Sequence, residues 1–176
     1  MPGVQRQPLP PGALHERYAR DGAYTDCYVT HIDRAVSHEE FVAAFYTTWL
    51  FKLERWILSW SVKKPSTDAQ ARGIAHGDIR EFAAWTEEAR TPDQLLMCDF
   101  LGQTRSWFRV SPQSPQSTTL YFGSVVTSRV NPKTGQRELG RSYRALLGFH
   151  KLYSRALLAA ARSRLSRMPR SLVRER

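Results

Sequence analysis

Residues 94–130 read QLLMCDFLGQTRSWFRVSPQSPQSTTLYFGSVVTSRV, and this stretch decides the fold class. It holds three runs rich in aliphatic, aromatic and β-branched residues, at 94–100, 104–110 and 118–130. The segments between the runs are short and contain glycine, proline, serine and glutamine, which favour turns. Short links between consecutive strands join neighbours that run in opposite directions. The stretch therefore predicts an antiparallel meander.

On the C-terminal side of the meander we expect a long helix from about Leu139 to Ser166. Apolar residues recur there every three or four positions, and basic residues occupy the other side. The expected apolar face consists of Leu139, Tyr143, Leu146, Leu147, His150, Tyr153, Leu157, Ala160 and Ala161. Met168-Pro169 ends the pattern, because proline cannot continue a helix.

On the N-terminal side, residues 24–32 (YTDCYVTHI) alternate in polarity and predict a strand. Ser37 and Glu40 fit a capping box, which would start one long helix over 41–60. Three tryptophans of that helix, at 49, 56 and 60, fall at helical spacing, and core packing is the better interpretation of them than an aromatic pocket. A short helix is expected at about 67–75, whereas residues 78–90 fit a helix or a strand equally well.

The expected fold class is α+β, with a curved antiparallel sheet gripping the long C-terminal helix. Such a sheet buries the apolar face of the helix and leaves room for a cavity between the two. Residues 1–22, rich in proline and glycine, are expected to form a flexible N-terminal arm. Residues 23–166 would form the domain, and 167–176 a basic C-terminal tail.

Several segments look like an uncharacterised bacterial branch, a domain-of-unknown-function family, of the START-like helix-grip superfamily. That superfamily includes polyketide cyclases, pathogenesis-related plant proteins and lipid-transfer domains. The segments are YTDCY at 24–28, FYTT at 45–48 with LER at 53–55, FAAW at 82–85, TRSW at 104–107, LYFGS at 120–124 and FHKLYSR at 149–155. The likeness covers roughly residues 24–165 and carries no catalytic spacing.

The resemblance implies a ligand pocket and assigns no reaction. It favours a strand over 82–89, which gives the order β-α-α-β-β-β-β-α. One departure is that about five strands are expected here, where the superfamily usually has seven. A smaller sheet implies a smaller or collapsed cavity.

Charge is concentrated at the C-terminal end of the chain. The formal net charge is +10, and residues 139–176 alone carry ten basic residues against one acidic residue, Glu175. This segment could contact an anionic surface weakly, although interleaved aromatics and known nucleic-acid motifs are missing from it, so nucleic acid is not a favoured partner.

The chain shows no sign of a membrane span or an export signal. The longest apolar run, Phe41–Phe51, is 11 residues long, about half of what a transmembrane helix needs. Cys27 and Cys98 lack a CxxC partner and are interpreted as buried thiols of a reducing compartment. A cytoplasmic, bacterial protein is the expectation.

Weak candidates for catalytic groups are His150, Asp26 and Asp99. His150 could act as an acid or base from the apolar face of the last helix, and a buried histidine bonded to a neighbouring hydroxyl is the alternative. Asp26 and Asp99 lie in predicted strands and could do acid–base work, or could pair with Arg105, with Arg109 or with a backbone donor at the sheet edge.

Candidate ligand-binding residues are Arg105, Trp107, Arg109, Tyr121, His150 and Tyr153. Arg105, Trp107 and Arg109 share one face of a strand, where two guanidinium groups beside an indole could hold an anion or a planar ring. The same pattern also occurs on strand faces that are exposed to solvent. No histidine or cysteine spacing suggests a metal site, and no cofactor is predicted.

Three functions compete. The first is a carrier or sensor that binds a small hydrophobic or aromatic molecule between sheet and C-terminal helix, and lipid is one such ligand. The second is a cofactor-free, cyclase-like enzyme that uses His150 with an acidic or phenolic partner. The third is an interaction module that acts through the basic C-terminal segment.

Overall fold

The computed structural model describes residues 3–61, 65–127, 129–130, 137–138 and 141–168, with the backbone alone for 57–61, 129–130, 137–138 and 141–150. The helices are α1 (Glu16–Arg20), α2 (His38–Tyr46), α3 (Trp49–Ser61), α4 (Asp68–His76) and α5 (Arg141–Arg167). The strands are β1 (Gln5–Arg6), β2 (Tyr24–Ile32), β3 (Glu81–Phe82), β4 (Trp85–Thr91), β5 (Gln94–Asp99), β6 (Thr104–Ser114), β7 (Ser117–Val126), β8 (Arg129–Val130) and β9 (Arg137–Glu138).

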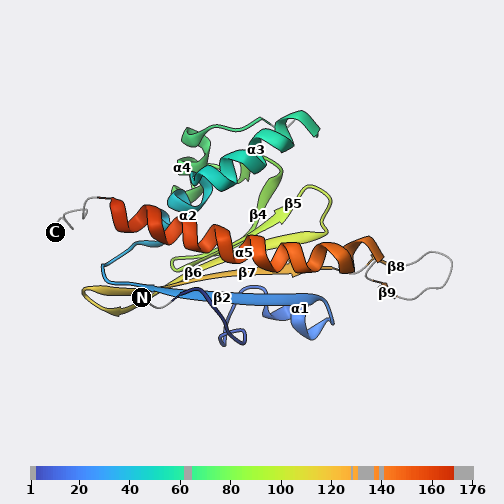
Figure 1. Cartoon of the computed structure of the whole chain (residues 1–176), viewed down its shortest axis with the longest axis horizontal. Coiled ribbons are helices and arrows are strands. Elements are labelled where there is room, and N and C mark those ends of the chain that lie inside the picture. The colour runs from blue at the N-terminus through green and yellow to red at the C-terminus, as the bar shows by residue number, and fades with distance from the viewer. Residues whose placement is uncertain (1–2, 62–64, 128, 131–136, 139–140, 169–176) are drawn as a thin grey trace.

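An antiparallel sheet of seven strands forms the middle layer, in the order β1-β2-β7-β6-β5-β4-β3. The long helix α5 lies across one face of this sheet, with α2, α3 and α4 beside it, and α1 lies on the other side (Figure 1). This arrangement of a curved open sheet and a C-terminal helix confirms the predicted α+β class and is consistent with the helix-grip fold.

The expectation of about five strands is wrong, because two short edge strands escape detection in the sequence. β1 and β3 are two residues long, and each extends an edge of the sheet by pairing with β2 or β4. The three meander strands that we predicted are β5, β6 and β7. β2 pairs with β7 over its whole length, so the first long strand lies next to the last one of the meander.

The expected single helix over 41–60 is two helices. Ser37 forms the predicted capping box with Glu40 at the start of α2. The Thr47 hydroxyl donates to the carbonyl of Ala43, and the Thr48 hydroxyl accepts from the amide of Phe51, 3.2 Å away. Thr48 therefore caps α3 just after α2 has ended, and the helix axis changes direction there.

Two hydrophobic cores lie on opposite faces of the sheet. The larger one lies under α2, α4 and α5 and includes Phe45, Phe108 and Phe122. The smaller one lies under the N-terminal segment and includes Cys27, Leu96 and Trp107. Because neighbours along a strand point to opposite faces, Phe108 belongs to the first core and Trp107 to the second.

Residues 3–22, expected as a flexible arm, are packed against the sheet. The amide of Gln7 donates to the carbonyl of Cys27, 2.9 Å away, beyond the end of the β1–β2 ladder. Ala13 and His15 are buried, and His15 is completely inaccessible to solvent. The segment closes one face of the sheet, so α5 and the N-terminal segment enclose the sheet from two sides.

Candidate functional site

The most unusual polar group on the α5 side of the sheet is the hydroxyl of Tyr46, at the end of α2. It is buried and has no hydrogen-bond partner. Its ring packs against Phe51, Phe82 and Phe108, with centroid distances of 4.8, 4.9 and 5.3 Å. A buried hydroxyl without a hydrogen-bond partner costs about 1–3 kcal/mol of stability. A ligand atom that accepts a hydrogen bond from it would therefore gain binding free energy.

The ionisation of Tyr46 depends on its burial and on Glu54 of α3. Burial raises the pKa of the Tyr46 hydroxyl far above its usual value, and the charge of Glu54 adds to the shift. Burial also raises the pKa of Glu54, while a hydrogen bond donated by the Tyr153 hydroxyl of α5 opposes that shift. We call Tyr46, Glu54 and Tyr153 the inner polar cluster.

Within the inner polar cluster, the hydrogen bond from Tyr153 to Glu54 links α5 to α3, and Tyr46 contributes a buried hydroxyl from the end of α2. Tyr46 and Glu54 come from helices on either side of the break at Thr47, and Tyr153 comes from the middle of α5. Burial raises the pKa of Tyr153 well above its usual range, with the negative charge of Glu54 adding to the shift, so its hydroxyl stays protonated. In the described structure the Tyr46 hydroxyl is a donor without an acceptor, while the Tyr153 hydroxyl donates to Glu54.

Another buried polar atom without a partner lies on the same side of the sheet. The Thr30 hydroxyl of β2 is buried and makes no hydrogen bond. Because Tyr28 and Ile32 belong to the core under α5, strand alternation places Thr30 toward α5 as well.

Asp26, a predicted catalytic candidate, lies on the α5 side and is fully engaged. It is 2% exposed, and its Oδ1 accepts from the amide and hydroxyl of Ser124 at 2.9 and 2.8 Å. Its Oδ2 accepts from the hydroxyl of Tyr24 at 3.1 Å. Of the partners considered, the arginines are absent from this set and a backbone donor, the Ser124 amide, is present, so Asp26 links β2 to β7 through neutral donors.

Asp99, the other acidic candidate, organises the turn between β5 and β6. Its Oδ1 accepts from the amide of Gln103 at 2.7 Å, and its Oδ2 accepts from the hydroxyl of Thr104 at 3.0 Å. It lies apart from Asp26, because β5 is three strands away from β2 in the sheet. The arrangement is that of a turn cap, and a catalytic role of Asp99 stays a prediction.

Four predicted ligand residues lie on the opposite face from α5, beneath the N-terminal segment. They are Arg105, Trp107, Arg109 and Tyr121. Arg105, Trp107 and Arg109 do share one strand face, but Trp107 and Tyr121 belong to the smaller core. These residues therefore cannot line a space between the sheet and α5, and their role in binding stays a prediction.

The two arginines of this group are already paired. Arg105 donates to Glu88 at 3.1 Å, and its guanidinium lies 4.6 Å from the centre of the Tyr18 ring. Arg109 donates to Asp93 at 3.1 Å. Burial alone would raise the pKa of Glu88, but hydrogen bonds from Tyr18, Arg17 and Arg105 lower it below its usual value.

Trp107 is buried and held by the N-terminal segment. Its indole donates to Oε1 of Gln94 at 2.9 Å, and the same oxygen accepts from the amide of Leu14 at 3.2 Å. The His15 ring lies 4.5 Å from the indole, and neither of its nitrogens has a hydrogen-bond partner. Burial lowers the pKa of His15 to about 4, with the nearby Asp26 carbonyl opposing, so the ring is neutral.

Gly123 is needed where His15 and Trp107 meet β7. A Cβ at this position would lie 2.7 Å from the Asp26 carbonyl oxygen, 2.9 Å from His15 Nε2 and 3.0 Å from Trp107. Any side chain at 123 would therefore force the backbone or the histidine to move.

His150 is the remaining candidate, and its side chain lies outside the described residues. Its backbone belongs to α5, three residues before Tyr153. The sequence reasoning missed Tyr46, Glu54 and His15. Glu54 offered one signal, since it is the one acidic residue in the otherwise apolar and basic stretch 41–60.

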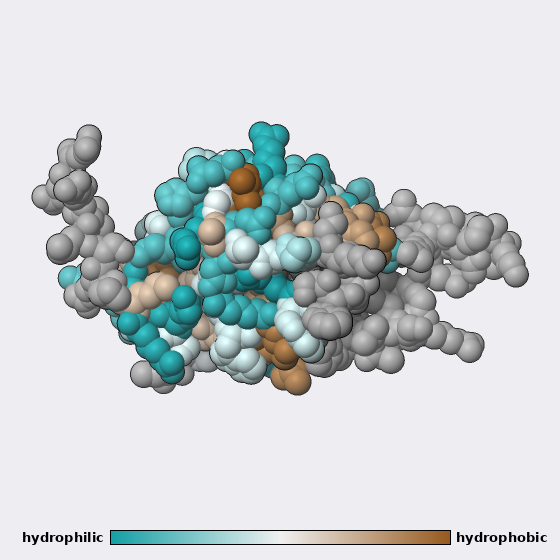
Figure 2. Space-filling view, turned by 90° about the horizontal axis from the view of Figure 1, so that it is seen from above, coloured by the Kyte–Doolittle hydropathy of each residue, from teal (hydrophilic) through white to brown (hydrophobic). Residues whose placement is uncertain are grey.

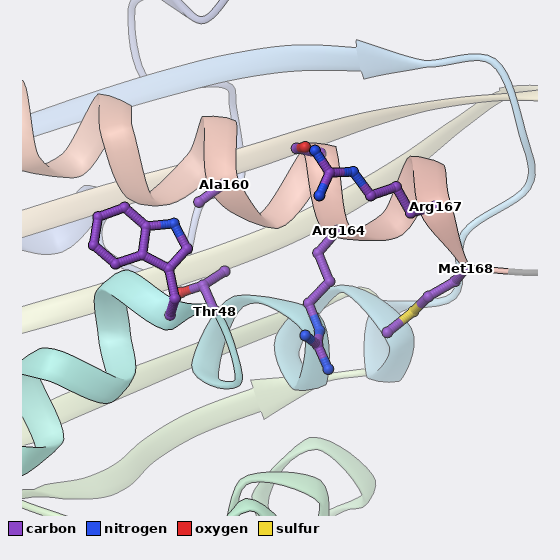
Figure 3. Close-up of a pocket in the computed structure, with 7 residues that line it drawn as sticks. Thr48, Ala160, Arg164, Arg167 and Met168 are labelled. Atoms are coloured by element: carbon purple, nitrogen blue, oxygen red, sulfur yellow. The ribbon is translucent and has the colours of Figure 1, made fainter.

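Three hollows open to the outer surface in the described part of the chain. One of about 440 Å³ lies between the start of α3 and the end of α5 and is bordered by Trp49, Arg164 and Arg167 (Figure 3). Others of about 580 and 520 Å³ lie at Ser37 with Pro112, and at Asp33 with Arg162. These three hollows do not include Tyr46 or Glu54.

Neither a metal centre nor a membrane span is found in the described parts. No group of three or more potential ligand side chains is close enough to hold a metal ion there. Among the described helices, none combines the length and the apolar character needed to cross a membrane.

Comparison with known proteins does not assign the chain to a family. No family model and no curated protein matches the chain. Among solved structures, the chain is similar to the solution NMR structure of CalU16 from Micromonospora echinospora, with 14% identity and a TM-score of 0.40. The match covers 98% of this chain and 78% of that one, and at this TM-score it carries no argument. Membership of the START-like superfamily thus stays a prediction.

Proposed function

We propose that the protein binds a small, largely apolar molecule between the sheet and α5, and that the inner polar cluster holds an oxygen atom of that molecule. The observation that carries the proposal is the buried Tyr46 hydroxyl, which has no partner in the described structure. A ligand oxygen would accept from this hydroxyl and offset the cost of its burial.

The surroundings of the cluster support an apolar ligand body. Phe51, Phe82 and Phe108 contact Tyr46, and Phe45 and Phe122 continue the aromatic surface along the sheet. Binding sites for small molecules commonly combine such apolar walls with a few convergent polar groups. Tyr153 and Glu54 supply those groups from α5 and α3, and a ligand entering between the two helices would compete for their mutual hydrogen bond.

We prefer a carrier or sensor over the cyclase-like alternative because the Tyr46 hydroxyl needs only a ligand that accepts a hydrogen bond, and not a reaction. The enzymatic alternative depends on His150, and no observation of its side chain favours it. The interaction-module alternative depends on the basic C-terminal segment, residues 139–176, of which the side chains are described for 151–168.

Native mass spectrometry of the freshly purified full chain tests the proposal. We expect an adduct that is released on denaturation, and we expect Tyr46→Phe and Glu54→Gln to lose most of it, because each removes one of the polar contacts. Tyr18→Phe and Glu39→Gln are matched controls outside the cluster and should keep the adduct.

The opposite pattern would overturn the proposal. A wild-type chain without any adduct after purification from several growth conditions would contradict ligand binding. Loss of the adduct in Tyr18→Phe but not in Tyr46→Phe would place the ligand on the other face of the sheet.

A further inference from the structure

The outer side of α3 presents large apolar side chains to solvent. Trp49 is 73% exposed, Leu53 48% and Trp56 60%. Their spacing of four and three residues puts them on one stripe of the helix. We call these three residues the α3 stripe. The sequence predicted core packing for Trp49 and Trp56, and the structure shows that this prediction is wrong.

The helix break at Thr47–Thr48 explains why the stripe faces outward. The opposite side of α3 packs inward through Phe51 and Arg55, which are 3% and 8% exposed. Arg55 is fixed there by a 2.7 Å bond to Asp68. Since α3 can bury only one side, the apolar residues on the other side are left at the surface.

Two arginines lie next to this stripe. Arg164 and Arg167, from the last turns of α5, border the same 440 Å³ hollow as Trp49, with the hydroxyls of Thr48 and Ser163 beside them. Both arginines are exposed, and within the described residues neither makes an ion pair or hydrogen bond. Figure 3 shows Arg164 extending away from α5 and Arg167 running back along it. No acidic residue borders the hollow.

The rest of the surface on this side differs in character. Figure 2, which views the molecule from the side of α3 and α4, shows a mostly hydrophilic face interrupted by separate apolar patches. Leu152, 66% exposed, adds an apolar side chain on α5 next to Tyr153, which contacts α3. Exposed tryptophan and leucine beside unpaired arginine is the composition of a surface that lies in a membrane interface.

We propose that the α3 stripe, together with Arg164 and Arg167, docks on the surface of a bilayer that contains anionic phospholipid. The indoles would enter the headgroup region, and the two guanidinium groups would bind lipid phosphates. A second copy of the chain fits this face less well. A two-fold contact through the stripe would bring the arginines of both copies toward one another without an acidic partner in the hollow. The inference is independent of the interior ligand.

Co-sedimentation of the full chain with vesicles tests this docking. The two vesicle types are phosphatidylcholine alone and phosphatidylcholine with about 30% phosphatidylglycerol. We expect binding to the second type at about 50 mM NaCl, weakened on the order of tenfold at about 500 mM. Trp49→Ser with Trp56→Ser, and separately Arg164→Gln with Arg167→Gln, should each weaken binding on the order of tenfold.

Matched controls distinguish binding through the α3 stripe and the two arginines from nonspecific adsorption to vesicles. Phe100→Ser with Leu101→Ser removes two other exposed apolar side chains, and Arg20→Gln with Arg72→Gln removes two other exposed charges. Both control variants should bind like the wild type, and all variants should keep the wild-type circular dichroism spectrum, because every changed side chain is exposed.

Several outcomes would overturn the proposal. One is no binding to anionic vesicles at low salt. Another is equal loss in the control pairs. Binding that survives both surface variants but disappears in a chain with Arg170, Arg174 and Arg176 changed to Gln would assign the contact to the C-terminal tail. A dimer that Trp49→Ser with Trp56→Ser converts to a monomer, with vesicle binding unchanged, would assign the stripe to self-association.

Discussion

The two faces of the sheet are closed in different ways. On one face the N-terminal segment covers Trp107. The side-chain oxygen of Gln94 holds the segment in place, because it accepts hydrogen bonds from both the Trp107 indole and the Leu14 amide. On the other face α5 and α2 cover a larger aromatic core, but polar atoms such as the Tyr46 hydroxyl stay without partners. The N-terminal face also holds unpartnered atoms, the two ring nitrogens of His15, so missing partners alone do not separate the faces. The α5 face differs because its unpartnered hydroxyls border the larger aromatic core, and this combination is why the proposed ligand is placed there.

The largest expected effect tests whether the N-terminal segment is a true part of the fold. Trp107→Ala should lower the free energy of unfolding by about 3–5 kcal/mol, because the indole is completely buried under that segment. Phe108→Ala, which empties the neighbouring position on the α5 side, should cost a similar amount. Urea denaturation measures both. A loss below about 1 kcal/mol for Trp107→Ala alone would show that the segment is only loosely attached.

A smaller effect concerns pH and the buried histidine of the N-terminal face, His15. Burial lowers the pKa of His15 from 6.5 to about 4, so the unfolded chain binds more protons between these values. Stability should therefore fall as the pH falls from 6.5 to 4, by about 3 kcal/mol from this residue. His15→Phe should remove that part of the loss, although the substitution itself changes the packing against Trp107.

The measurement is urea denaturation of wild type and His15→Phe at several pH values between 4 and 7. His38, buried with its pKa lowered to about 4 by burial and by Arg90, contributes a similar slope that both proteins keep. His76→Gln, at an exposed position, is the control and should leave the slope unchanged. Identical slopes for wild type and His15→Phe would show that the buried ring is not where the lost stability arises.

The smallest effect compares two tyrosine hydroxyls on the α5 side of the sheet, one without a hydrogen-bond partner and one with a partner. In ligand-free protein, Tyr46→Phe should raise the free energy of unfolding by about 1 kcal/mol, because it removes a buried hydroxyl without a partner. Tyr24→Phe, which removes a hydroxyl bonded to Asp26, should lower it by about 1 kcal/mol instead. Thermal denaturation compares the two. A loss of stability in Tyr46→Phe would mean that the hydroxyl is satisfied within the folded chain.

The sequence predicted the fold class because strong local patterns agree with the final structure. The strands at 94–99 and 104–114, the capping box at Ser37 and the last helix all follow from periodicity and turn chemistry. The two edge strands escaped detection because a strand of two residues is too short to show an alternation of polar and apolar positions. The helix break escaped detection because the apolar pattern continues across it. The break depends on hydrogen bonds of the Thr47 and Thr48 hydroxyls, which end α2 and begin α3.

The candidate site was less predictable because it depends on which face a residue takes. Arg105, Trp107 and Arg109 share a strand face as expected, but strand alternation does not tell which face is covered by α5. The N-terminal segment decided this, and its proline-rich sequence gave no sign of its packing. Tyr46 and Glu54 lie on opposite sides of the helix break, in α2 and α3, whereas the sequence alone placed them on one continuous helix.

Hydrogen exchange of the full chain, measured as purified and again after apolar molecules have been stripped from it, shows whether a ligand lies between the sheet and α5. We expect stripping to accelerate amide exchange in α3 and α5 and to leave residues 5–18 unchanged, because the proposed ligand contacts only the α5 side. Acceleration confined to residues 5–18, or no change anywhere in the chain, would contradict it.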